Sequence, residues 1–272
     1  MSSSSGADGP SAGGAALLID EPAPAVARLT ISNPGKRGAL DHTILDGIAQ
    51  TLPALEARCV IITGEGASFS AGYDIGDLSG SSSAEEAEAL VAHPFTAALE
   101  AIEDYAYPTI AALNGHTLGG GLELALSCDL RLAAGTIALG MPPAKLGLIY
   151  SHTGVRKFID VIGAARTREL FLTARQIDAR TARAWGLVNP LCEPGRLAAD
   201  AIALAAEIAA CAPLAQIGNK HVIRRLLEAQ GGIEPATEQE LIAIRRACFA
   251  SEDFREGVRA FAEKREPRFT GR

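Results

Sequence analysis

The sequence predicts an α/β fold followed by a helical C-terminal region. Over the first two thirds of the chain, short buried strands alternate with helical patterns, as in parallel strands joined by crossover helices. From about Leu197 to the end, nearly every segment has helical spacing. The 272 residues are 48% hydrophobic and 21% charged, which is typical of a globular protein with one large domain and an appendage.

The first half of the chain begins with strands. Residues 16–32 predict two short strands around a turn that contains proline, and 58–66 predicts a buried strand that ends at a glycine turn. Between them, apolar residues at helical spacing predict a helix within 42–57. A loop over 68–78 and a polar segment then lead into a helix that reaches about Tyr105.

The second half repeats the alternation and then becomes helical. Residues 107–115 predict another buried strand, 119–129 a glycine turn followed by a helix, and 130–142 two short strands. Three helices are expected next, over 151–163, 165–174 and 178–186. We expect a Ser/Gly-rich disordered tail over 1–14, a core over 15–195 and a helical region over 196–272.

Composition excludes several classes of function. The formal net charge of −7 argues against nucleic acid as a main partner, because phosphate binding needs a basic face. The five cysteines and five histidines are dispersed, so neither a disulfide framework nor a metal site is expected. No apolar run is long enough for a membrane span, and the first residues lack the pattern of a signal peptide. The expected location is the cytoplasm.

Three consecutive glycines, Gly119 to Gly121, are followed by Glu123 within an apolar run. A turn between a strand and a helix exposes backbone N–H groups that favour negative charge. A dinucleotide-binding turn needs a different glycine spacing, near the start of the fold. The other interpretation is an oxyanion site, in which an N–H group faces a carbonyl oxygen that gains charge. Glu123 itself is also explained by the helix dipole alone.

A second loop of small residues offers a second N–H donor. It reads Ser70-Ala71-Gly72-Tyr73-Asp74 and also follows a buried strand. Each loop alone is explained by a tight turn with close packing. The two loops together are a more specific indication of an oxyanion site than either loop alone.

With these two segments, the chain resembles the enoyl-CoA hydratase/isomerase (crotonase) superfamily. The segments are "IITGEGASFSAGYDI" and "NGHTLGGGLELALSCDLRLA", and the resemblance extends from about Leu29 to the C-terminus. It implies a crotonase-like spiral of ββα units, trimers or pairs of trimers, and an acyl-CoA thioester as substrate, with no separate cofactor. It also implies that the oxyanion donors are the N–H groups of Tyr73 and Gly120.

The resemblance makes Glu123 one of the two catalytic glutamates of the hydratases, but Pro143 stands where the second is expected. Proline transfers no proton, so hydration and isomerisation are both in doubt. The methylmalonyl-CoA decarboxylases of the superfamily also lack the second glutamate, and "MPPAKLGLIYSHTGV" is similar to their segment. Tyr150 matches a tyrosine that could orient a substrate carboxylate, although a loop aromatic is the simpler explanation of that residue. Those enzymes have a histidine where this chain has Tyr73.

Coenzyme A phosphates need cations. The candidates are Lys36 and Arg37 in an early loop and Lys264, Arg265 and Arg268 near the C-terminus, of which the resemblance favours Lys36 and Lys264. The expected substrate-binding residues also include the following: Ala71, Gly72, Asp74, Ile75 and Gly119.

Three functions remain open from the sequence. The first is decarboxylation of a short 2-carboxyacyl-CoA. The second is an enoyl-CoA hydratase or isomerase of fatty-acid metabolism, which a second acid such as Asp74 or Asp77 beside Glu123 would support. The third is a catalytically weak acyl-CoA-binding protein.

Overall fold

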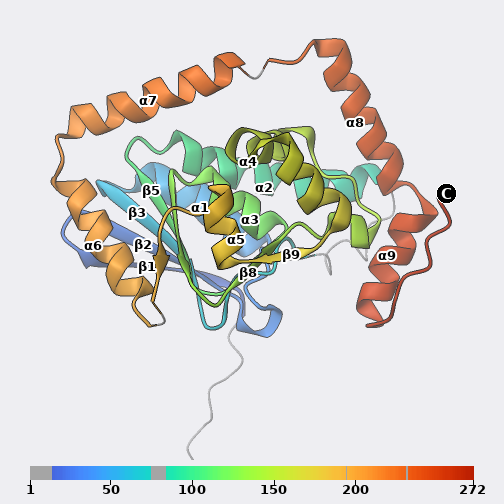
Figure 1. Cartoon of the computed structure of the whole chain (residues 1–272), viewed down its shortest axis with the longest axis horizontal. Helices are drawn as coiled ribbons and strands as arrows, with labels where there is room; N and C mark the ends of the chain where they lie inside the picture. Colours follow the sequence, from blue (N-terminus) through green and yellow to red (C-terminus); the bar gives the residue numbers. More distant parts are fainter. Residues whose placement is uncertain (1–13, 75–83, 194, 231) are drawn as a thin grey trace, which may run out of the picture.

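A computed structural model of the chain describes residues 14–74, 84–193, 195–230 and 232–272 (Figure 1). Residues 1–13 of the tail expected over 1–14, and the predicted contact Ile75, lie outside the described residues. The larger sheet is parallel except for its first pair of strands. In order across the sheet, its strands are β1 (Ala16–Ala23), β2 (Val26–Ser32), β3 (Cys59–Gly64), β5 (Thr109–Leu113), β7 (Leu130–Ala134) and β10 (Leu191–Cys192).

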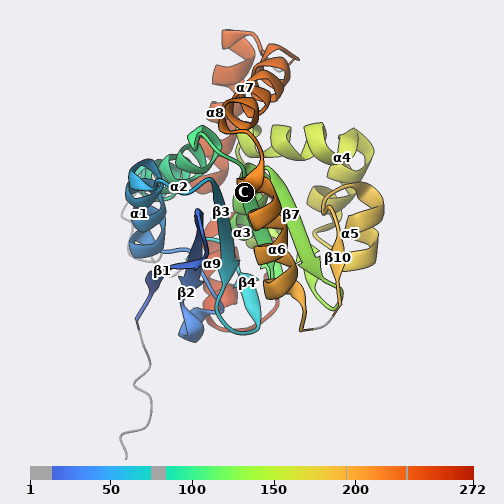
Figure 2. The ribbon, with the colours of Figure 1, turned by 90° about the vertical axis from the view of Figure 1, so that its left-hand side faces the viewer.

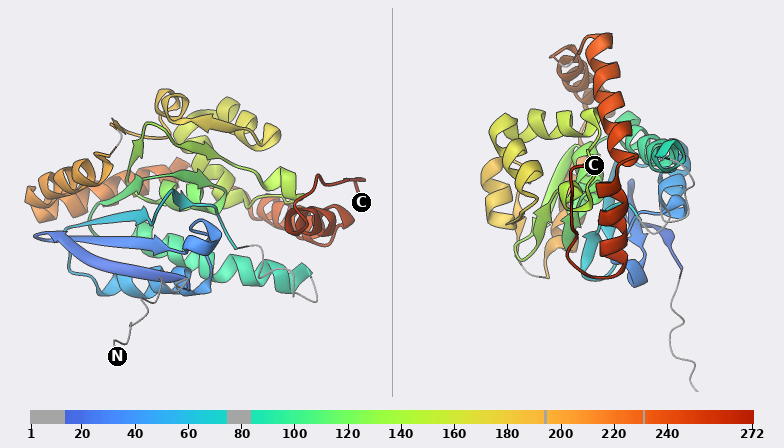
Figure 3. Two further views of the ribbon diagram at one scale, coloured as in Figure 1. Left: turned by 90° about the horizontal axis from the view of Figure 1, so that it is seen from below. Right: turned by 90° about the vertical axis from the view of Figure 1, so that its right-hand side faces the viewer.

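A second sheet is made of short strands. Its order is β4 (Ser68–Ser70), β6 (His116–Leu118), β8 (Ala138–Gly140) and β9 (Gln176–Asp178). The strands β3, β5 and β7 of the larger sheet are each followed by one of these short strands and then by a helix. This repeated ββα order confirms the predicted spiral, seen from below in Figure 3.

The helices surround the two sheets. They are α1 (His42–Thr51), α2 (Ala84–Asp104), α3 (Gly120–Ser127), α4 (His152–Thr173), α5 (Ala179–Trp185), α6 (Leu197–Ala210), α7 (Pro213–Gln230), α8 (Pro235–Phe249) and α9 (Glu252–Ala262), with short 3-10 turns η1 (Pro34–Lys36), η2 (Leu52–Ala54) and η4 (Pro143–Leu146). Several helices begin directly after a residue whose side chain accepts a hydrogen bond from a backbone N–H group of the first turn, as N-cap residues do. These caps are Asp41, Ser151, Asp178 and Ser251.

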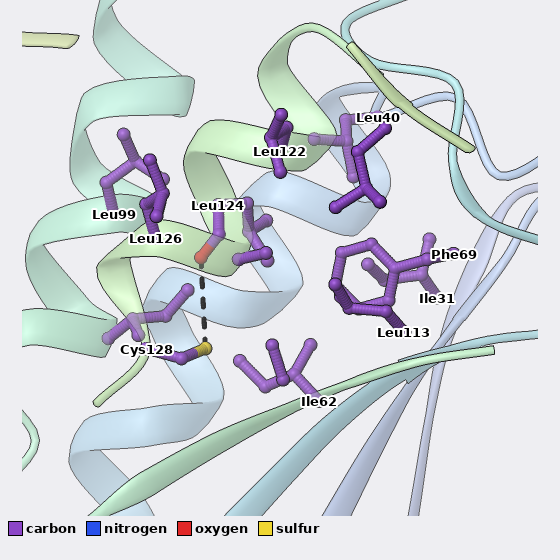
Figure 4. Close-up of a cluster of buried hydrophobic side chains, with 14 of the residues drawn as sticks. Ile31, Leu40, Ile62, Phe69, Leu99, Leu113, Leu122, Leu124, Leu126 and Cys128 are labelled. Atoms are coloured by element: carbon purple, nitrogen blue, oxygen red, sulfur yellow. Dashed lines mark hydrogen bonds between the residues drawn. The ribbon is translucent and has the colours of Figure 1, made fainter. Parts of the chain in front are cut away.

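Alternation along the strands builds the core on both faces of the larger sheet. In β3, Val60 and Ile62 face the main core, whereas Cys59 and Ile61 face the layer beneath α6. Figure 2 shows α6 lying across this second face. In the main core, Leu122 and Leu124 of α3 are fully buried among side chains of the sheet (Figure 4). Helix α3 is therefore enclosed along its whole length, which fixes the position of Glu123.

The predicted elements mostly match the structure. The two helices expected over 151–163 and 165–174 form one helix, α4, which is interrupted at Gly163 with φ of +75°. The loop expected over 68–78 begins with the strand β4, and the strands β6, β9 and β10 were not predicted. These strands have two or three residues, too few to show an alternating pattern.

The C-terminal helices differ in what they pack against. Helix α6 packs on the larger sheet, and α8 and α9 return to the body, where α8 packs on α2 and α9 on η4 (Figure 3). Between them, α7 runs along the outside and contains no buried residue (Figure 1). Its exposed apolar side chains include Leu214, Ile223 and Leu226.

The described residues also bear on membrane and metal binding. None of their helices alone is both long and apolar enough to cross a membrane; α6 and α7 pass that test only as a pair bent by 105°. No group of three or more potential metal-ligating side chains occurs in the described part of the chain. All five cysteines are free.

Candidate active site

The glycine turn joins β6 to α3 in a conformation that suits glycine. Gly119 has φ of +53° and ψ of −126°, and its N–H donates to Gly140 O over 2.9 Å. A methyl group added to Gly121 would lie 2.5 Å from Ser70 Cβ, so α3 approaches the second loop as closely as glycine allows. Gly120 is the first residue of α3, where the N–H has no carbonyl partner within the helix.

The two small-residue loops meet at their backbones. A methyl group on Gly72 would lie 3.0 Å from Leu118 O and 3.3 Å from Gly120 N. A methyl group on Gly120 would lie 3.4 Å from Tyr73 N. The structure thus brings together the backbone nitrogens of Tyr73 and Gly120, which the family resemblance implies as a pair of donors.

The Glu123 carboxyl group is buried beside this turn, with 2% of the residue exposed. The Tyr150 hydroxyl donates to Glu123 Oε2 over 2.5 Å. On the other side, Lys157 Nζ lies 3.9 Å from Glu123 Oε1. Burial raises the pKa of Glu123, while Lys157 and the Tyr150 hydrogen bond lower it in part. Burial and the neighbouring Glu123 raise the pKa of Tyr150 well above its ordinary value.

Tyr150 is fixed by packing as well as by this hydrogen bond. Its ring meets the edge of Phe171 at 5.7 Å, and Phe171 in turn meets Phe158. Tyr150 stands directly before Ser151, the cap of α4. The position of the Tyr150 hydroxyl beside Glu123 is therefore fixed by packing. An ordinary aromatic residue in a loop would not need this packing or this hydrogen bond.

Sequence reasoning missed the charged residues behind Glu123. Lys157 on α4 pairs with Glu103 on α2 over 2.5 Å and donates to Ser127 Oγ over 2.8 Å. Arg245 on α8 is close enough to lower the pKa of Glu123. Tyr150, Lys157, Glu103 and Ser127 line a groove of about 1050 Å³, which also borders α7 and α8. No sequence signal marks Lys157, Glu103 or Arg245, because each is an ordinary charge on a helix.

Tyr73 and Pro143 form other parts of the surroundings. The Tyr73 hydroxyl lies 3.5 Å from His42 Nε2, and its ring packs against Phe249 and Phe254 of the C-terminal helices. Pro143 is buried in η4. Asp74 pairs with Lys36, and no ion pair or hydrogen bond between Asp74 and Glu123 is found among the described residues. Asp77 lies outside them.

The predicted coenzyme A contacts fall into two regions. Around Lys36, Ala71 N donates to Arg37 O over 3.1 Å, and Leu40 N donates to Gly72 O over 2.8 Å, so the early loop lies along the second glycine loop. Lys264 lies exposed just after α9.

The other two C-terminal cations contact Glu256 in different ways. The Arg265 guanidinium pairs with Glu256 over 2.5 Å, whereas Arg268, which is exposed, donates its backbone N–H to the same carboxylate over 2.9 Å. The Arg265 side chain is therefore explained as a structural contact.

Comparison with known proteins identifies the family. The model of the enoyl-CoA hydratase/isomerase family matches residues 21–272. The chain belongs to this family. It is therefore an acyl-CoA-processing lyase of the crotonase superfamily.

Relatives of this family member carry different activities in their names. A probable enoyl-CoA hydratase of Bacillus subtilis (strain 168) is 36% identical over 253 residues, which cover 90% of this chain and 95% of the relative. A solved methylmalonyl-CoA decarboxylase, in complex with 2-nitronate-propionyl-CoA, has a TM-score of 0.86 at 31% identity, covering 94% of this chain and 99% of the other. An enoyl-CoA hydratase/carnithine racemase from Magnetospirillum magneticum has a TM-score of 0.75 at 32% identity, covering 94% and 96%.

Proposed function

We propose that this family member decarboxylates a short 2-carboxyacyl-CoA thioester of the methylmalonyl-CoA type. One observation carries the proposal. The Tyr150 hydroxyl is hydrogen-bonded to the buried carboxyl of Glu123, while Pro143, at the position of the second hydratase glutamate, supplies no acid. The higher TM-score with a methylmalonyl-CoA decarboxylase than with a hydratase/racemase supports the same reaction.

The two glycine loops supply the electrostatic part of the mechanism. The thioester carbonyl oxygen accepts hydrogen bonds from the backbone N–H groups of Tyr73 and Gly120, whose nitrogens the fold holds close together. When the bond to the carboxyl carbon breaks, its electron pair moves into the thioester and negative charge develops on that oxygen. A donor in such a position stabilises the transition state by about 3 kcal/mol.

Tyr150 orients the carboxylate that leaves. The breaking C–C bond must lie out of the thioester plane, so that it overlaps the carbonyl π system. A hydrogen bond from a fixed hydroxyl to one carboxylate oxygen selects this conformation. The products are carbon dioxide and a thioester enolate, which takes up one proton at carbon. No base is needed for the carbon–carbon cleavage.

A proton count assigns a role to Glu123. A tyrosine hydroxyl has one hydrogen to donate, so Tyr150 cannot donate to Glu123 and to a substrate carboxylate together. If Glu123 is protonated, its own hydrogen is donated to the Tyr150 oxygen, and the Tyr150 hydrogen is available to the substrate. Burial raises the pKa of Glu123 and so favours the protonated form. This form also keeps a proton near the enolate.

The test is to mix the purified protein with methylmalonyl-CoA and, separately, with crotonyl-CoA, and to follow the products by mass spectrometry. We expect loss of carbon dioxide from the first substrate, reduced about 100-fold or more in Tyr150→Phe. Tyr107→Phe is the matched control, because Tyr107 precedes β5 and accepts a hydrogen bond from Lys220 Nζ at its backbone oxygen, which the substitution leaves in place. Water addition to crotonyl-CoA without decarboxylation would replace this proposal with hydration, the activity in the name of the Bacillus subtilis relative.

A homotrimer, or a pair of trimers, is proposed as the assembly. Helix α7 has no buried residue, and Leu214 is 85% exposed on it. A second copy of the chain would bury such side chains, each with a gain of about 1.5 kcal/mol or more. Light scattering coupled to gel filtration measures the assembly, and a monomer of 28.2 kDa would contradict it.

A further inference from the structure

Three titratable groups, Glu123, Lys157 and Glu103, form a row behind the Tyr150 hydroxyl. The Glu123 carboxyl lies between Tyr150, at 2.5 Å from Oε2, and Lys157, at 3.9 Å from Oε1. Beyond it, Lys157 is 2.5 Å from Glu103 Oε1. The row therefore runs from the hydroxyl through the buried acid to an ion pair that borders the groove.

Lys157 is held toward Glu103 and away from Glu123. Its ammonium group has three hydrogens to donate. One interaction is with Glu103 and one with Ser127, at 2.5 and 2.8 Å, whereas the Glu123 oxygen is beyond hydrogen-bonding distance. Because Coulomb attraction falls with distance, the positive charge of Lys157 acts mainly on Glu103.

We propose that the Glu103–Lys157 ion pair sets the direction of the Glu123–Tyr150 hydrogen bond. By holding Lys157 back, Glu103 lets Glu123 stay neutral and donate to Tyr150, so that the Tyr150 hydrogen faces the substrate. Lys157 released from Glu103 would move onto Glu123 and favour its carboxylate, which would then occupy the Tyr150 hydrogen. Glu103 and Lys157 are thus positioning residues that act through Glu123. The effect on turnover rests on the proposed function, but the effect on Glu123 does not.

The charged and titratable groups that act on Glu123 from the described elements act in both directions on its pKa. Burial raises the pKa of Glu123, and the charge of Glu103 raises it further. Lys157, the hydrogen bond from Tyr150, and Arg245 on α8 lower it. The sign of each contribution predicts opposite effects when Glu103 or Lys157 is neutralised.

The test is a carboxyl titration by NMR, with protein labelled with ¹³C at the glutamate side-chain carboxyl and the Glu123 signal assigned by its loss in Glu123→Gln. In Lys157→Met the pKa of Glu123 is expected to rise by about one unit, and in Glu103→Gln to fall by about one unit. Arg156→Met is the matched control, because Arg156 neighbours Lys157, lines the same groove and pairs with Asp160 instead. It should leave the titration unchanged.

Turnover of methylmalonyl-CoA provides the second measurement. The kcat of Glu103→Gln is expected to fall about tenfold at neutral pH with little change in KM, whereas in Lys157→Met the loss of kcat at high pH is expected to move to a higher pH. Circular dichroism checks that each variant is folded, and opposite pKa shifts in two variants of one ion pair are not a general effect of misfolding.

Titrations of Glu123 that are unchanged, or that shift in the same direction in both variants, overturn the proposal. So does a shifted titration in Glu103→Gln with unchanged kcat. If the wild-type protein decarboxylates nothing, the titration still decides the charge link, and only the proposed function fails.

Discussion

Gly154, in the first turn of α4, lies against both members of the Tyr150–Glu123 pair. A methyl group added there would come within 2.6 Å of Tyr150 Cε1 and 2.9 Å of Glu123 Oε1. Real side chains do not approach so closely, so the backbone of α4 leaves room for this pair only with glycine at this position.

The first prediction is that Gly154→Ala displaces Tyr150 and Glu123. We expect at least a tenfold loss of kcat and a decrease of about 1–3 kcal/mol in the free energy of unfolding. Gly218→Ala is the control, because Gly218 on α7 has open space around it, and alanine should stabilise that helix by about 0.5–1 kcal/mol. Steady-state kinetics and urea unfolding measure both variants. Equal changes of kcat and of the free energy of unfolding in the two variants would contradict the close packing of Gly154 against Tyr150 and Glu123.

The second prediction concerns pH and the buried acid. Because the pKa of Glu123 is higher in the folded protein than in the unfolded chain, its contribution to stability is greatest below the unfolded pKa of about 4.3 and is lost as pH rises through the folded pKa. Glu123→Gln removes this loss. The difference in Tm between the variant and the wild type should therefore shift in favour of the variant as pH rises from 5 to 9. A difference that stays constant over this range would show that Glu123 does not titrate there.

The third prediction concerns Glu256, whose contribution to stability changes with pH in the opposite direction to that of Glu123. Arg265 and Arg259, together with the Arg268 N–H, hold the pKa of Glu256 well below its ordinary value. The stability that Glu256 contributes is therefore present above about pH 4.3 and is lost as pH falls toward its folded pKa. Glu256→Gln should speed hydrogen exchange of the Arg268 amide at pH 7. The ratio of the exchange rates in variant and wild type should approach one in acid.

The fourth prediction concerns the cations assigned to coenzyme A. Lys36→Met should raise KM for the CoA thioester about tenfold and leave kcat within about twofold, as expected for a lost charge-assisted contact. The same thioester carried on pantetheine, which lacks the nucleotide phosphates, serves as the control substrate. If Lys36 binds a phosphate, its substitution should hardly affect KM for pantetheine thioesters. An equal increase for both substrates would limit Lys36 to its ion pair with Asp74.

The sequence predicted the parts of this molecule that depend on local pattern. The buried strand β3 and the helix α3 after its glycines have long apolar runs, and both were predicted. The short strands β4 and β6 were not, because three residues show no period, and their pairing joins residues as far apart in the sequence as Ser68 and His116.

The same division applies to the site. The two glycine loops could be paired from the sequence because each contains an unusual cluster of small residues. Lys157 and Glu103 could not, since they are charged residues on helices, 34 and 20 positions from Glu123, and only the packing of α2, α3 and α4 brings them together. Arg265 and Arg268 were considered as phosphate ligands from their charge alone. The contacts that Glu256 makes with the Arg265 guanidinium and with the Arg268 backbone N–H depend on how the chain turns after α9.

The packing of Phe249 and Phe254 against Tyr73 has a consequence for biosynthesis. These two residues come after both glycine loops and Glu123 in the sequence, so they leave the ribosome later. Both glycine loops and Glu123 are synthesised well before them, and domains fold as their segments emerge. A nascent chain can thus form the sheets and the Tyr150–Glu123 pair while one wall beside Tyr73 is still missing. The surroundings of Tyr73 are therefore completed only after the segment that carries Phe249 and Phe254 has been synthesised and has packed against it.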